Sequence, residues 1–179
     1  MACRVDPALQ LLVHTTVALG KLFGPDDQCP AKVGTTENVR TFAGDGLPLA
    51  AWDNHAQGRG GCGEPFVWQR VRRRYRSSQF PHPTISSSPC KLLRVAEVEL
   101  GVGWCAKVGT DKRGPTWADY GEEAQVSMDV AWRLEEALCL ASQLITADDA
   151  NQLVGTDTLV PYGPEGTVIA WSGILYATY

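Results

Sequence analysis

The chain has 179 residues, of which 44% are hydrophobic and 20% are charged, and its formal net charge is -4. This size and composition exclude a disordered chain and predict one globular domain, residues 1–179, with its own core. The acidic balance argues against a general nucleic-acid coat, because such a protein needs a basic field or a large basic face. No apolar run approaches the roughly 18 residues of a membrane span, so we expect no membrane contact.

The first predicted element is an amphipathic helix. Asp6 and Pro7 are typical of a helix start, and Gly24-Pro25 is typical of its end. Between them, apolar side chains recur every three to four residues, and we expect this stripe to face the core. The stripe consists of Val5, Leu9, Leu12, Thr16, Leu19 and Phe23.

A long irregular region is predicted over residues 25–64. It is rich in Gly, Asp, Asn and Pro, with turn-type clusters such as "AGDGLP" and "GRGGCGEP". A short strand is expected near residues 40–42 or 47–52. So long a loop is unusual inside a compact domain, and we interpret it as an arm or a binding loop.

Two long strands follow, over residues 64–78 and 92–107, and the Pro- and Ser-rich segment between them predicts an antiparallel pair. Strict alternation in the first strand leaves Arg73 on one face and gathers the other arginines on the opposite face. These are Arg70, Arg72, Arg74 and Arg76. Such a basic stripe is compatible with a solvated face, with a contact to an acidic subunit and with a nucleic-acid grip. On the second strand, Arg94 is the exception on an otherwise apolar face.

A second helix is predicted over residues 122–145, and a last strand over residues 167–178. The helix has an apolar stripe consisting of Val126, Val130, Leu134, Leu138, Ala141 and Ile145. The last strand is apolar on both faces, which favours a central position in a sheet. Residues 146–166 read as a loop with one short strand. The order of elements predicts an α+β fold, a mainly antiparallel sheet with two helices packed on one face and long loops or arms.

Catalytic patterns are sparse. The common nucleophile, phosphate-loop and dinucleotide motifs are absent from the sequence. Asp53 and His55 could belong to a hydrolase, but no third group can be named for them. Adjacent acids on the second helix point about 100° apart and form no acid–base pair. We therefore expect no enzymatic activity, no cofactor and no metal.

The six cysteines are scattered and lack the spacing of a zinc site. We expect reduced thiols. A bridge between Cys62 and Cys90, or between Cys105 and Cys139, stays open for a protein released from a cell.

Several segments resemble head-to-tail connector proteins of actinobacterial phages with long non-contractile tails. The resemblance covers residues 61–179, although the order of the Met-Asp pair is reversed relative to the family and the approach to the last strand is less glycine-rich. The matching positions are Cys62-Gly63, Phe80-Pro81, Glu99-Leu100-Gly101-Val102, Cys105, Met128-Asp129, Cys139, Gly163-Pro164-Glu165-Gly166 and Trp171. The order of elements is similar to that of tail terminators.

This resemblance implies a structural virion protein of the phage neck without catalysis. A tail terminator forms a hexameric ring that caps the tail tube and joins the tail to the head. The implied partners are other copies of the chain, the major tail tube protein and the stopper or other neck proteins, assembled in the host cytoplasm and kept in the virion. The alternatives are a stopper or adaptor, or a nucleic-acid-binding module.

Within such a ring, the predicted arginine stripe would face either a neighbouring copy or the DNA in the lumen. We favour the neighbouring copy, because acidic side chains are available on the second helix and the loop after it. They are Glu122, Glu123, Asp148 and Asp149.

Overall fold

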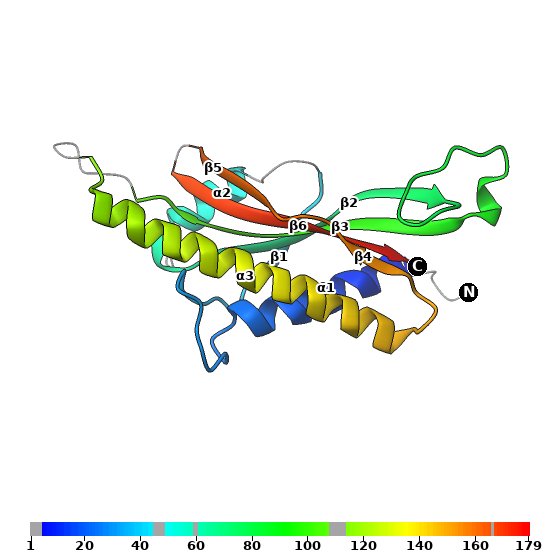
Figure 1. Cartoon of the computed structure of the whole chain (residues 1–179), viewed down its shortest axis with the longest axis horizontal. Coiled ribbons are helices and arrows are strands. Elements are labelled where there is room, and N and C mark those ends of the chain that lie inside the picture. The colour runs from blue at the N-terminus through cyan, green and yellow to red at the C-terminus, as the bar shows by residue number, and fades with distance from the viewer. Residues whose placement is uncertain (1–4, 45–48, 59–60, 108–113, 166) are drawn as a thin grey trace.

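The computed structural model describes residues 5–44, 49–58, 61–107, 114–165 and 167–179 (Figure 1). These residues form an α+β fold, as predicted. The helices are α1 (Ala8–Phe23), α2 (Leu49–Ala56) and α3 (Trp117–Asp148), with short 3-10 turns at Gly61–Gly63 and Pro89–Lys91. The strands are β1 (Val39–Thr41), β2 (Phe66–Ser77), β3 (Leu93–Cys105), β4 (Val154–Thr156), β5 (Val160–Glu165) and β6 (Val168–Thr178).

The described strands form one mixed sheet in the order β1-β2-β3-β6-β4, with β5 also paired to β6. The long pairs β2–β3 and β3–β6 are antiparallel, and among the described strands only β1 runs parallel to its neighbour, β2. β6 has β3 on one side and β4 and β5 in succession on the other. This confirms the central position predicted from its two apolar faces.

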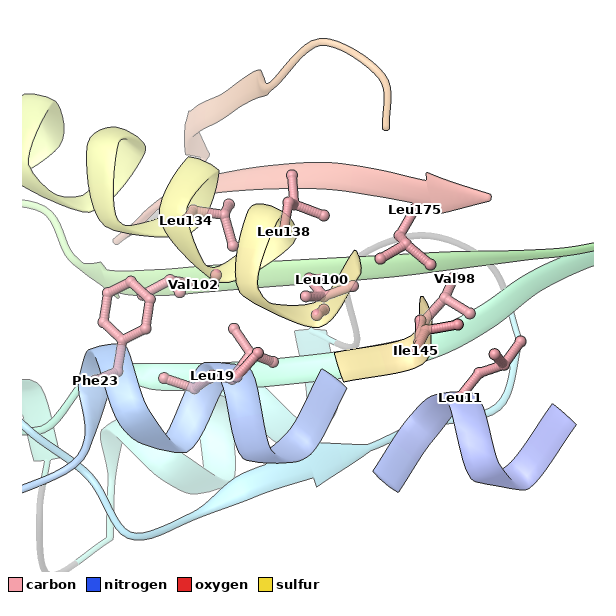
Figure 2. Packing of buried hydrophobic residues seen from close by; sticks show 14 of the residues in the cluster. Leu11, Leu19, Phe23, Val98, Leu100, Val102, Leu134, Leu138, Ile145 and Leu175 are labelled. Carbon is pink, nitrogen blue, oxygen red and sulfur yellow. The ribbon is translucent and has the colours of Figure 1, made fainter. Parts of the chain in front are cut away.

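The main core lies between the sheet and two helices. α1 and α3 lie side by side on one face (Figure 1), as predicted, and the stripe of α3 from Val130 to Ile145 is buried. Figure 2 shows side chains from α1, α3, β3 and β6 converging in one cluster. Its labelled members are Leu11, Leu19, Phe23, Val98, Leu100, Val102, Leu134, Leu138, Ile145 and Leu175.

The buried face of α1 differs from the predicted stripe. Leu19 and Phe23 are buried, but Leu9 and Thr16 are exposed. The other buried positions of α1 are Leu11 and three small or polar residues, Ala8, Thr15 and Ala18. Small side chains let α1 approach α3 and the sheet closely, and the hydroxyl of Thr15 is hydrogen-bonded to the side chain of Gln69 on β2. α1 therefore has apolar residues on two faces. The spacing of apolar residues in the sequence could not show which face is buried.

The opposite face of the sheet carries a second, smaller core under α2. Its members are Trp52, Phe66, Trp68, Val168 and Ala170. The Trp52 ring meets the Phe66 ring edge-on, with centroids 5.9 Å apart. The described part of residues 47–52 is helical, so a strand there is wrong. The alternative strand near residues 40–42 is confirmed by β1. Residues 45–48 and 59–60 lie outside the described residues.

α3 begins five residues before the predicted start. Its first turn has a capping box: the Thr116 hydroxyl accepts a hydrogen bond from the Asp119 amide, and the Asp119 carboxylate accepts one from the Thr116 amide at 2.7 Å. At 32 residues, α3 extends beyond the sheet at its N-terminal end (Figure 1). None of the helices in the described segments combines the length and hydropathy needed to span a membrane.

Neither of the alternative cysteine pairings is present. Cys62 is bonded instead to Cys105, with Cα atoms 5.3 Å apart. The antiparallel register places the start of β2 beside the end of β3, since Phe66 pairs with Gly103, and these two cysteines lie just outside that pair. The expectation of reduced thiols is therefore wrong for this pair. It holds for Cys29, Cys90 and Cys139, while Cys3 lies outside the described residues.

Candidate assembly interface

A β-bulge separates the arginines that were predicted to share one face. Val71 pairs with Val98 and Arg73 with Glu97, so Arg72 is the extra residue and the alternation reverses there. Arg70 and Arg73 consequently face the α2 side of the sheet. The predicted single stripe is wrong, because its last two members, Arg74 and Arg76, face the helix side with Ala96 and Arg94.

On the α2 side, the arginines are neutralised within the chain. Arg70 donates to Glu99 through Nε at 2.8 Å and to the Gly44 carbonyl at 3.0 Å, and its side chain is only 6% exposed. The Glu97 carboxylate is paired with Arg72 at 3.2 Å and with Arg73 at 2.9 Å. Arg70 is therefore part of the fold, whereas the half-exposed Arg72 and Arg73 remain accessible.

On the helix side, the arginines lie beyond the N-terminal end of α1. Arg74 forms a salt bridge with Asp6 at 2.6 Å, and this guanidinium holds the pKa of Asp6 below its usual range. Arg76 donates to the Leu92 carbonyl at 3.1 Å. Arg94 is exposed and forms no salt bridge among the described residues. The arginines on the helix side are therefore Arg74, Arg76 and Arg94. The sequence analysis noted Arg94 only as a charged residue on an otherwise apolar strand face.

The acids expected to meet arginines of a neighbouring copy already have partners in this chain. Lys107 contacts Glu122 through its ammonium group and Glu123 through its amide. Asp148 lies 3.3 Å from a ring nitrogen of His14, which connects the end of α3 to α1. Asp149 accepts hydrogen bonds from Asn151. These four carboxylates are thus not the free acidic patch that the sequence suggested.

The outward face of α1 is apolar and uncovered. Leu9, Val13 and Val17 are each about half exposed and lie four residues apart, so they form one stripe along the helix. Val5, just before the helix, is 75% exposed. A stripe of this kind on a regular element marks a contact surface more strongly than scattered apolar residues do.

α3 has a second uncovered apolar surface. Trp117, Tyr120, Met128 and Trp132 fall within a sector of about 120° of the helix at 100° per residue. Trp117 is 90% exposed, and its ring centroid lies 5.9 Å from that of Tyr120. Trp132 is 57% exposed, so it belongs to this surface and not to the core.

Arg133 is a structural arginine that sequence reasoning missed. It lies buried on α3 and is paired with Asp129 at 3.1 Å and with Asp27 at 2.7 Å. It also donates to the Leu22 carbonyl at 3.1 Å, so it fastens the segment after α1 to α3. The available signal was an Asp and an Arg four residues apart on a predicted helix.

The residues of the hydrolase hypothesis lie on α2. The Nε2 atom of His55 lies 2.7 Å from the Glu64 carbonyl oxygen, and the ring packs against Trp52 and Phe66. This contact anchors α2 to the start of β2. Among the described residues, there is no group of three or more His, Cys, Asp or Glu side chains placed to hold a metal ion.

Comparison with models of known protein families gives no match for this chain, and none of the curated proteins compared with it matches either.

Proposed function

We propose that the protein is a tail terminator, a structural subunit of the neck of a long-tailed phage that assembles as a ring on the last ring of the tail tube. The proposal rests on the resemblance described above and on one observation in the fold. Each of the two helices that cover the sheet has a second, uncovered apolar face. These faces are formed by Val5, Leu9, Val13 and Val17, and by Trp117, Tyr120, Met128 and Trp132.

Two separate apolar surfaces are what a ring subunit needs. In a closed ring, each copy offers one surface to the next copy and a different surface to the previous one. A further surface must contact the tube below. A chain that works alone has no such requirement, and exposing these side chains to water would only lower its solubility.

The shape of the molecule also supports assembly. The start of α3 and the tip of the β2–β3 hairpin project at opposite ends of an elongated body (Figure 1). The Trp117–Tyr120 pair lies on the first of these projections. At the second, Ile85 in the connecting loop is fully exposed. Projections of this kind give each copy the reach to contact neighbours on two sides.

Light scattering of the purified full-length chain, alone and with tail tubes, tests the proposal. Six copies of the 19.4-kDa chain amount to about 116 kDa. We expect a closed species near this mass. Trp132→Glu should shift it toward the monomer because a carboxylate would replace an apolar contact. Gln57→Glu, which adds the same charge at an exposed position after α2 on the other face of the sheet, is the matched control. A monomer under both conditions would contradict the proposal.

A further inference from the structure

Three arginines crowd the helix-side face of the β2–β3 hairpin. Arg76 lies directly opposite Arg94 in the register, and Arg74 lies two residues away on the same face. With Tyr75 and Tyr179 they line a cavity of about 300 Å³. Like charges directly opposite one another destabilise a strand pair. Only Arg74 among the three forms a salt bridge within the described residues, so the cluster has excess positive charge.

An acidic groove lies elsewhere on the molecule, between α3 and residues 156–159. Its volume is about 540 Å³, and Glu135 and Asp157 line it without any Lys or Arg. Asp157 is held in position, since its carboxylate accepts hydrogen bonds from the Tyr176 hydroxyl at 3.2 Å and from the Thr158 amide at 2.7 Å. Glu135 is exposed and forms no salt bridge within the described part of the chain.

The groove and the arginines belong to different edges of the sheet. The groove lies beside β4 and β5, whereas the arginines lie on β2 and β3, on the other side of β6. The two charges therefore do not neutralise one another within one copy. Between two copies, a contact from one surface to the other would be heterologous and could repeat from copy to copy.

We propose that the arginine cluster of one copy docks into the acidic groove of the next copy. Guanidinium groups form charge-assisted hydrogen bonds with carboxylates, and Glu135 and Asp157 present two carboxylates in one groove. Leu138 and Leu159 in the same groove would pack against the aliphatic part of an arginine side chain. This inference rests on the proposed function, because it assigns the contact that closes the ring.

The test uses three variants of the full-length protein: Arg94→Glu, Glu135→Lys, and both changes in one chain. Both side chains are exposed and lack a salt bridge in the described residues, so the fold should persist, which thermal unfolding checks. Sedimentation velocity should show each single reversal weakening self-association at least about 10-fold. An equimolar mixture of the two single variants should associate more strongly than either variant alone, because every contact between unlike variants joins groups of opposite charge. The double reversal should restore association to within about threefold of the wild-type chain.

The controls are Lys21→Glu and Glu37→Lys, which change the net charge equally but lie outside both surfaces. Both should associate like the wild-type chain. Rings that survive both single reversals would overturn this contact and leave the proposed function standing. A wild-type chain that stays monomeric, even with tail tubes, would overturn both. If Arg94→Glu keeps the ring but loses binding to a short DNA duplex in fluorescence anisotropy, the arginines face DNA and the inference is wrong.

Discussion

Substituting Gly101 by alanine should destabilise the fold through a single steric contact. Gly101 lies on β3 directly opposite Trp68 on β2, and the indole ring occupies the space above the glycine. A Cβ atom at this position would lie 2.2, 2.4 and 2.6 Å from three atoms of that ring. Trp68 is only 2% exposed and packs under α2, so the ring cannot move aside without disturbing the second core.

Overpacking of this kind costs about 1–3 kcal/mol, which corresponds to a melting temperature lower by about 2–12 °C for a chain of this size. Gly103→Ala is the matched control, because it lies on the same face of the same strand and its Cβ would meet no atom closer than 3.5 Å. Differential scanning calorimetry measures both variants. In a Trp68→Leu background, Gly101→Ala should cost much less. Equal stability of Gly101→Ala and the wild-type chain would refute the reasoning.

Three further variants test other parts of the fold. Arg133→Ala should lower the free energy of unfolding by about 2 kcal/mol in urea titrations, because it removes a buried side chain and leaves partly buried acceptors unpaired; a loss below about 1 kcal/mol would contradict this role. Cys62→Ser should cost about 2–4 kcal/mol under oxidising conditions and nothing with reductant, since the bond to Cys105 closes a loop with a sequence separation of 43. Burial, and then the hydrogen bond to Asp157, raise the pKa of Tyr176 from 10.0 to about 12. The protonated hydroxyl therefore stabilises the fold fully below about pH 10, and about 2 kcal/mol should be lost as the pH rises to about 12. Tyr176→Phe should abolish that part of the pH dependence.

The long elements could be predicted from the sequence because each buries one face over many residues. The stripe of α3 and the two-faced apolar pattern of β6 are repeated often enough to determine type and position. α2 could not be predicted in this way. It is 8 residues long, and its position depends on Trp52 packing against Phe66, a contact between segments that are separate in the sequence.

The arginine site was harder to predict. Arginines stand on both sides of the alternation in β2, so the sequence does not reveal the bulge at Arg72 that moves Arg74 and Arg76 to the other face. The acidic groove is assembled from α3 and the segment before β5, which only the fold brings together. The role of Arg94 could have been predicted. A charged residue on an otherwise apolar strand face indicates an end of the buried face or a contact with another group.

Negative-stain electron microscopy of the protein mixed with tail tubes from a long-tailed actinobacterial phage tests the central claim most directly. We expect a ring at one end of each tube, and we expect Arg94→Glu and Glu135→Lys each to reduce the fraction of capped tubes. Protein that binds the portal-side ring and ignores tube ends would identify a stopper or adaptor. Bare tube ends beside the wild-type protein would contradict its assignment as a tail terminator.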